Sequence, residues 1–263
     1  MLERLKEIMK LFDQRFKEKM KWLDPFTYVD KAIMPILNPS NNQAIGWIVY
    51  VFFAFVFAWL LYSLVGFVLG TSSPIVVVVS PSMEPVYFRG DAIILQRATV
   101  ENIEGTDVFL PGEKVSGRAF SEIGEVVFGA GQDGRQTARE IRFFNSSTVP
   151  VARNGSIVVY FSKWRAQPII HRVVARIHAM DGVFVLTKGD SVNNSTIDQD
   201  CGAVTTGFPE KNCISLYPVP VREIQGTAFF RVPFVGCVKL WALDDFVSLL
   251  AEGRLPVHFN GIC

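Results

Sequence analysis

The sequence predicts a mainly β domain with Greek-key or barrel-like sheets, preceded by an N-terminal amphipathic helix and one membrane-spanning helix. β-branched and apolar runs after residue 70 predict the β domain, and turn signals such as Asn154-Gly155 and Asp181-Gly182 separate them. Residues 44–70 predict the spanning helix, because they contain no Asp, Glu, Lys or Arg and exceed the roughly 20 helical residues that cross a hydrocarbon core. The expected strands are Ile75–Val79, Ala92–Leu95, Ile157–Phe161, Ile169–Ile177, Val183–Thr187 and Gly226–Val232.

The charge of residues 1–43 predicts the orientation of the spanning helix. This segment holds eight Lys and Arg residues, whereas Arg89 is the one basic residue between Gly70 and Asp91. Because positive charge stays on the cytoplasmic side, we expect a single-pass protein with its N-terminus in the cytoplasm and its main domain outside. Apolar residues at three- and four-residue steps predict an amphipathic helix over residues 2–23. That helix either lies on the inner membrane face or packs on itself or on a partner. A secretory signal peptide fits poorly, because the apolar run is too long and begins too late.

The composition excludes several kinds of partner. The chain has 26 Lys and Arg residues against 25 Asp and Glu, a net charge of +1, so it has no basic field for nucleic acid. No Cys or His group has metal-ligand spacing, and we expect neither a metal nor a cofactor.

Cys201 and Cys213 enclose a short polar loop, and either form a disulfide, which would fit an external domain, or remain free thiols. Cys237 and Cys263 have no evident partners. Glycosylation acceptor patterns compatible with an external location occur at Asn145, Asn154, Asn193 and Asn194.

Two regions stand apart from the expected β domain of residues 71–236. Residues 98–150 are less regular and rich in glycine, and we interpret them as an inserted subdomain. Residues 237–263 are apolar but include Lys239, Asp244 and Asp245. Charged groups are costly inside a bilayer, so these residues predict an amphipathic tail and not a second span.

Ser82 is the candidate nucleophile, because it lies twelve residues after the apolar run ends at Gly70. A serine hydroxyl needs a base within hydrogen-bond reach, and commonly a third group that orients the base. The chain has three histidines. His171 and His178 share one strand-like run, and their odd separation predicts side chains on opposite faces. His258 lies in the tail.

Several acids are candidates for the orienting group. Asp190, Asp198 and Asp200 follow a predicted strand in a polar turn. Acids in turns are commonly solvated or capping groups, but a loop at a strand end can also present a carboxylate to a site. Lys188 is an alternative base, although that interpretation leaves the motif around His171 unexplained.

Five motifs occur in an order that resembles the type I signal peptidases, in the archaeal and endoplasmic-reticulum branch. They are Ser80-Pro81-Ser82-Met83-Glu84-Pro85 followed by Gly90-Asp91, then Gly155 to Tyr160, Ile170-His171-Arg172-Val173, Lys188-Gly189-Asp190 with Asn193-Asn194, and Phe230 to Gly236. The resemblance covers the spanning helix and most of residues 71–236, and it implies a signal-peptidase-like β domain. Bacterial members carry a lysine where His171 stands here.

The resemblance implies a role for each matching residue. Ser82 would be the nucleophile and His171 the general base. The backbone N–H of Ser82 would stabilise the oxyanion, and Ser80 would either assist it or stabilise the turn. The family has two acids in this region, and we rank Asp198 first as the partner of His171, then Asp190, then Asp200.

The implied reaction is removal of signal peptides from secretory preproteins through an acyl-enzyme, beside the lipid bilayer and the protein-translocation channel. The enzyme would lie in the cell membrane or the endoplasmic-reticulum membrane. The substrate would pair with the sheet edge formed by Ile75, Val76, Val77, Val78 and Val79, unless this run is a buried core strand. Two alternatives stay open: a self- or regulator-cleaving relative, which the membrane helix and His171 disfavour, and an inactive membrane-tethered β scaffold.

Overall fold

A computed structural model describes residues 24–131, 134–201, 213–241 and 246–252. It divides the chain into two compact units, residues 1–65 and 66–263. The amphipathic helix expected over residues 2–23 and the third histidine, His258, lie outside the described residues.

The first unit contains a short helical segment followed by the start of a long helix. The segment consists of α2 Pro25–Tyr28, a π-helical turn Val29–Ile33 and α3 Met34–Leu37. Asp24 begins α2, and its carboxylate accepts the N–H of Phe26 at 3.0 Å, as expected of an N-cap. The connection to the long helix is closed by Asn38, whose side-chain oxygen accepts the N–H of Asn42 at 2.8 Å.

The long helix α4, Gln43–Leu69, confirms the predicted apolar helix. Among the described residues it is the one helix long and apolar enough to cross a membrane. It has no polar face, and large side chains such as Phe52, Phe55 and Trp59 are exposed. A helix that is apolar on all sides is stable where apolar material surrounds it.

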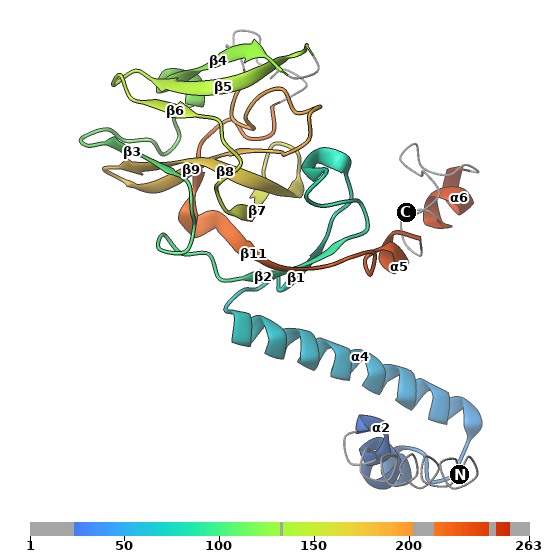
Figure 1. The fold of residues 1–263 in the computed structure, drawn as a ribbon. Helices are drawn as coiled ribbons and strands as arrows, with labels where there is room; N and C mark the ends of the chain where they lie inside the picture. Colours follow the sequence, from blue (N-terminus) through green and yellow to red (C-terminus); the bar gives the residue numbers. More distant parts are fainter. Residues whose placement is uncertain (1–23, 132–133, 202–212, 242–245, 253–263) are drawn as a thin grey trace, which may run out of the picture. The chain divides into compact units, whose positions relative to one another are not determined.

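The second unit is mainly β, as the sequence predicts, and its larger sheet has eight strands (Figure 1). Seven of them form the order β1-β2-β11-β7-β8-β9-β10, and each neighbouring pair in this order is antiparallel. The eighth, β3 Thr106–Leu110, pairs in parallel with the second half of β8. The other bounds are β1 Ile75–Val77, β2 Ala92–Gln96, β7 Ile157–Ser162, β8 Gln167–Ala179, β9 Gly182–Lys188, β10 Val219–Pro220 and β11 Ile224–Val232.

Strand β8 connects the two halves of this sheet. Its first half pairs with β7 and its second half with β9, with a register shift between Val173 and Ala175. A bulge of this kind changes which face the following side chains occupy. Accordingly, Val173 packs in one buried cluster with Tyr160, while Ala175 packs in another with Phe184.

A smaller sheet comes from the region interpreted as an insertion. It is antiparallel, in the order β4 Gly124–Ala130, β5 Gln136–Phe143 and β6 Thr148–Pro150, and it lies beyond β8 and β9 in Figure 1. Its side chains, including Ile141 and Phe143, share a buried cluster with Ile177 of β8 and Leu186 of β9. Residues 98–150 therefore contribute both β3 to the larger sheet and this second layer.

Short helical elements complete the unit. The 3₁₀ turns are Pro81–Met83, Phe120–Glu122 and Val221–Glu223, and the C-terminal helices are α5 Cys237–Lys239 and α6 Phe246–Glu252. Cys237 is buried with Leu240 against Val77 of β1. It is also disulfide-bonded, which the sequence analysis did not predict.

Candidate active site

Ser82 occupies a one-turn 3₁₀ helix that follows β1. Pro81 begins the turn, and its fixed φ suits the first helical position. Met83 is fully buried, and its carbonyl accepts the N–H groups of Val86 and Tyr87 at 2.9 and 3.0 Å. The turn is therefore anchored in the core on one side of Ser82, while the Ser82 side chain remains half-buried at the surface.

His171 lies next to this hydroxyl. It stands on β8 opposite Val158 of β7, and it is 2% exposed. Its Nε2 is 3.0 Å from the Ser82 Oγ. The two atoms are within hydrogen-bond distance although 89 residues separate them in the sequence.

Asp198 completes the group from the loop after β9. His171 Nδ1 lies 2.8 and 2.7 Å from its two carboxylate oxygens. Because an ionised carboxylate can only accept, Nδ1 carries the proton and Nε2 can accept the Ser82 hydroxyl proton. A hydrogen bond holds this loop against β9: the Asp198 N–H donates to the Thr187 carbonyl at 2.8 Å.

Two further hydroxyls donate to the Asp198 carboxylate. They belong to Thr187 and Tyr160, at 2.6 and 2.9 Å from Oδ2. Burial alone would raise the pKa of Asp198, but the charge and hydrogen bond of His171 and these two hydroxyls outweigh it, so the pKa lies below its ordinary value. Burial, together with the adjacent Asp198, raises the pKa of Tyr160 well above its ordinary value, so Tyr160 remains a donor.

The other two candidate acids have different partners. Asp190 is 3% exposed and forms a bidentate pair with Arg172, whose Nε and Nη2 lie 2.9 and 2.7 Å from its oxygens. Arg172 also donates to the Gly155 carbonyl at 2.7 Å. Asp200 accepts the hydroxyl of Thr196 at 2.6 Å. The structure thus brings Asp198 to His171. Asp190 instead forms an ion pair with Arg172, the residue that follows His171 on β8.

Ser80 and Lys188 were the remaining polar candidates. The Ser80 Oγ lies 3.2 Å from the Ser82 Oγ, on the exposed side of the turn. The Lys188 ammonium donates to the Gly189 carbonyl at 3.0 Å. Burial lowers the pKa of Lys188, but the nitrogen base within reach of the Ser82 hydroxyl is His171.

The two described histidines have separate environments. His178 pairs with Asp107 of β3, with 2.7 Å between Nε2 and Oδ1, and its ring stacks on Phe109. The sequence analysis placed the two side chains on opposite faces because an odd number of residues separates them. That argument is wrong, because the register shift in β8 interrupts the strict alternation of side chains between His171 and His178. They are kept apart by the length of strand between them, roughly 3.3 Å per residue.

The run expected to bind substrate forms one end of the larger sheet. β1 covers Ile75, Val76 and Val77 and pairs with β2. Ile75 and Val79 are 44% and 52% exposed, whereas Val78 is 1% exposed within a buried cluster. The run therefore combines a terminal strand with a core contact.

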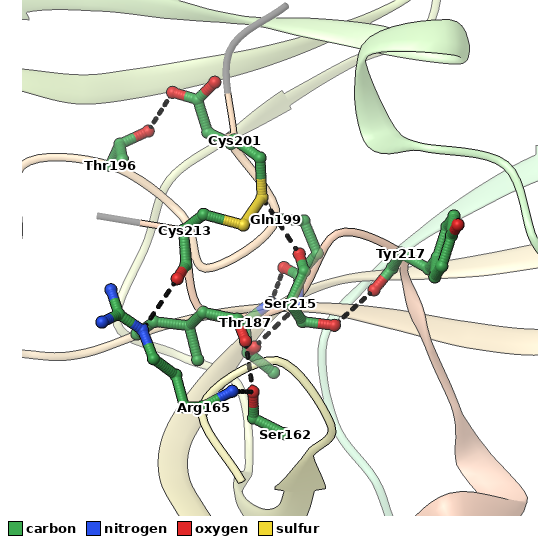
Figure 2. The surroundings of a disulfide bond; sticks show 11 residues. Ser162, Arg165, Thr187, Thr196, Gln199, Cys201, Cys213, Ser215 and Tyr217 are labelled. Atoms are coloured by element: carbon green, nitrogen blue, oxygen red, sulfur yellow. Dashed lines mark hydrogen bonds between the residues drawn. A yellow bond between two sulfur atoms is a disulfide. The ribbon is translucent and has the colours of Figure 1, made fainter. Parts of the chain in front are cut away.

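A disulfide joins the segment that follows Asp198 to the segment that returns to it. Cys201 and Cys213 are joined, and Figure 2 shows Arg165 donating to the Cys213 carbonyl, at 2.9 Å. The residues after Cys213 return to the acid loop, since the N–H groups of Ile214 and Ser215 donate to the Asp198 carbonyl at 3.0 and 3.1 Å. The disulfide thus ties together the two segments that hold the Asp198 backbone.

Some contributors were missed by sequence reasoning. Tyr160 ends one of the five motifs and Thr187 ends a predicted strand, but no local pattern marks either hydroxyl as a donor to Asp198. Arg172 stands beside His171 in its motif and could have been paired with an acid on that ground. In the part of the chain that the structure describes, no group of three or more His, Cys, Asp or Glu side chains could hold a metal ion.

Known proteins are similar in sequence to much of this chain, although no family model matches it. The signal peptidase complex catalytic subunit SEC11 of Clavispora lusitaniae is 30% identical over 198 residues, which cover 75% of this chain and 81% of that protein. The subunit of the same name from Schizosaccharomyces pombe is 25% identical over 211 residues, covering 78% and 86%. That from Pyricularia oryzae is 28% identical over 168 residues, covering 64% of this chain and 63% of its own length. The chain therefore spans less than two thirds of the Pyricularia relative.

Proposed function

Since the chain belongs to the family of signal peptidase complex catalytic subunits, we propose that it is a membrane-bound serine endopeptidase that removes N-terminal signal peptides from exported preproteins. The observation that carries this proposal is the 3.0 Å separation of Ser82 Oγ and His171 Nε2, with Asp198 on the far side of the ring. Nucleophile, base and orienting carboxylate in this arrangement are what acyl transfer requires.

The reaction begins with proton transfer. Neutral His171 accepts the Ser82 hydroxyl proton through Nε2 while Oγ attacks the scissile carbonyl carbon. Collapse of the tetrahedral intermediate breaks the peptide bond, and His171 returns the proton to the departing amine of the mature protein. The signal peptide remains as an ester on Ser82, and a water molecule activated by His171 then hydrolyses this ester.

Two groups assist this sequence. Asp198 holds the imidazole in the reactive tautomer and stabilises its charged form, and its lowered pKa keeps it ionised. The negative charge on the substrate oxygen requires a donor fixed in advance, for which we assign the Ser82 backbone N–H, with the exposed Ser80 hydroxyl as a candidate second donor.

The substrate is presented by the membrane. The apolar part of a signal peptide is proposed to lie in the bilayer beside α4, and its cleavage region to extend along β1 by main-chain hydrogen bonds. In this arrangement α4 spans the cell membrane or the endoplasmic-reticulum membrane. The N-terminus lies in the cytoplasm, and the β unit lies on the other side of the membrane. The relatives are named as the catalytic subunit of a complex, so we propose partner subunits for this chain too.

The direct test is processing of a preprotein in liposomes. Ser82→Ala is expected to abolish cleavage and to keep the unfolding temperature of the parent. Ser73→Ala changes a serine that precedes β1 and lies outside the site; this variant is the control and is expected to keep full activity. Cleavage by the Ser82→Ala variant at the parental rate would refute the proposal.

His171→Lys tests the choice of base. The His171 ring contacts Asp198 through Nδ1 and Ser82 through Nε2. A lysine ammonium cannot replace both contacts, so loss of turnover is expected. Parental turnover by this variant would show that the Ser-His assignment is wrong.

A further inference from the structure

The carbonyl oxygen of Ser82 accepts two hydrogen bonds from a distant loop. The Ser191 N–H donates at 2.9 Å and the Asn194 side-chain amide at 3.0 Å. A carbonyl oxygen has two lone pairs, so both are used. A one-turn helix leaves its last carbonyls without intrahelical donors, and the 189–196 loop supplies them here.

Gly189 shows how closely this loop approaches the turn. A Cβ at this position would lie 1.8 Å from the Asn194 amide nitrogen and 2.6 Å from the Ser82 carbonyl oxygen. Real Cβ atoms essentially never come within 3.0 Å of a heavy atom in a residue that is not their chain neighbour. Glycine is therefore required here for close approach, and any side chain would displace either the Asn194 amide or the Ser82 peptide.

The 189–196 loop is itself held from several sides. The Asn194 N–H donates to the Ser191 carbonyl at 3.0 Å, which forms a turn within the loop. The smaller sheet supports it through the Ala138 N–H, which donates to the Ser195 carbonyl at 2.6 Å. Arg153 donates to the Asp190 carbonyl at 2.7 Å. The loop is thus a fixed support with contacts to the smaller sheet.

We infer that Asn194 is a positioning residue, which holds the Ser82–Met83 peptide and thereby aims the Ser82 hydroxyl at His171. The inference rests on the proposed function and adds to it a residue that does not touch the reacting atoms. The carbonyl fixes the rotation about the Ser82 Cα–C bond, and hence where the Cβ and Oγ lie relative to β8. A displacement of about 1 Å in a reacting group can cost on the order of 10²-fold in rate.

The hydrogen bond can be observed without any enzyme activity. Ser82–Met83 is the one Ser-Met peptide in the chain. Labelling serine with ¹³C at the carbonyl and methionine with ¹⁵N therefore gives a single carbonyl–nitrogen correlation peak from this peptide. In Asn194→Ala the ¹³C shift is expected to move upfield, because the carbonyl loses a donor. Asn193→Ala is the matched control, since Asn193 is exposed and accepts from Arg135, and its peak is expected to stay in place.

Kinetics on a preprotein provide the second measurement. Asn194→Ala is expected to lower kcat by roughly tenfold to 10²-fold with little change in KM, because the hydroxyl is misaimed while the substrate strand is untouched. Asn193→Ala is expected to keep both constants.

A third variant separates positioning from general destabilisation. Asn194→Asp has nearly the same shape, but its ionised carboxylate cannot donate to the carbonyl. When the carboxyl is protonated it can donate again, so the activity of the variant relative to the parent is expected to rise as the pH falls toward about 4. Asn193→Asp adds the same charge one residue away and is expected to show no such rise.

The outcomes are distinct. An unmoved carbonyl peak in Asn194→Ala, or parental kcat in that variant, overturns the inference. A moved peak with lowered kcat and a pH-dependent recovery in Asn194→Asp supports it. A parent chain that cleaves no preprotein refutes the proposed function, and the carbonyl peak then still decides whether Asn194 holds the Ser82 peptide.

Discussion

Two buried carboxylates near His171 have different partners, and this difference predicts different mutational effects. Asp198 bonds the His171 ring, whereas Asp190 pairs with the Arg172 guanidinium. Asp198→Asn is expected to lower kcat on the order of 10⁴-fold with the fold retained, because an amide does not hold the imidazole in the reactive tautomer.

Asp190→Asn is the comparison for that variant. It leaves Arg172 without its charged partner and is expected to lower the free energy of unfolding by up to about 3 kcal/mol. Rates of preprotein cleavage and urea unfolding curves for both variants check the contrast. Equal rate losses in the two would mean that Asp198 is not the specific partner of His171.

The lowered pKa of Asp198 also predicts how stability depends on pH. A carboxyl whose pKa is lower in the folded state than in the unfolded chain, where it is about 3.9, stabilises the fold at pH values above the unfolded pKa. That contribution is lost as the pH falls through the folded pKa. The free energy of unfolding of the parent should therefore exceed that of Asp198→Asn by a constant amount above about pH 5, and the difference should shrink below about pH 4. Urea titrations across this range measure it, and a difference that grows in acid would contradict the account.

The residues of the site were predictable to unequal degrees. Ser82 and His171 could be proposed because a serine nucleophile requires a base and the chain has three histidines, and the resemblance to the signal peptidases supported both and ranked Asp198 first among the acids. Tyr160 and Thr187 could not, since their hydroxyls reach Asp198 only through the pairing of β7, β8 and β9. Local patterns carry no record of such long-range register.

At the level of secondary structure, the disulfide of Cys201 and Cys213 links the two segments that hold the Asp198 backbone. Replacing both cysteines by serine releases a loop with a sequence separation of 12 residues. The expected loss is about 2–3 kcal/mol in the free energy of unfolding, chiefly because the unfolded chain gains freedom. Reduced activity is expected as well, because Ile214 and Ser215 no longer hold the Asp198 carbonyl firmly.

Thermal or urea unfolding and cleavage rates test this expectation. Ser215→Ala is the control, since it alters the same segment, retains the disulfide, and removes one hydrogen bond to the Tyr217 carbonyl. A double serine variant as stable and as active as this control would show that the disulfide does not support the site.

The strands themselves were largely predictable, and their connections were not. Alternation and β-branched runs identify β1, β2, β7, β8, β9 and β11 from short stretches of sequence. The parallel pairing of β3 with β8 joins residues nearly seventy positions apart, as in Val108 with Ile177. The bulge in β8 has no marker in the sequence of Val173, Val174 and Ala175. Both features are decided by how the two sheets pack on a common core.

For the whole molecule, we propose that α4, the one described helix long and apolar enough to cross a membrane, anchors the chain there. Phe55 and Trp59 are exposed near its middle, 74% and 65% respectively. Changing both to lysine is expected to cost about 5–7 kcal/mol of insertion free energy, at about 2.5–3.5 kcal/mol for each lysine. The chain should then appear in the alkali-extractable fraction of membranes. Changing both to leucine keeps the helix apolar and is the control, and a lysine variant that stays with the membrane like this control would contradict a spanning role.

The central claim is that Ser82 itself forms the covalent intermediate. The most direct measurement is rapid quenching of the full-length chain during turnover of a preprotein, followed by mass spectrometry of its peptides. The account predicts an ester of the released signal peptide on Ser82, which accumulates and decays with turnover and is missing in Ser82→Ala. Cleavage with an adduct on another residue, or continued cleavage by Ser82→Ala, would contradict it.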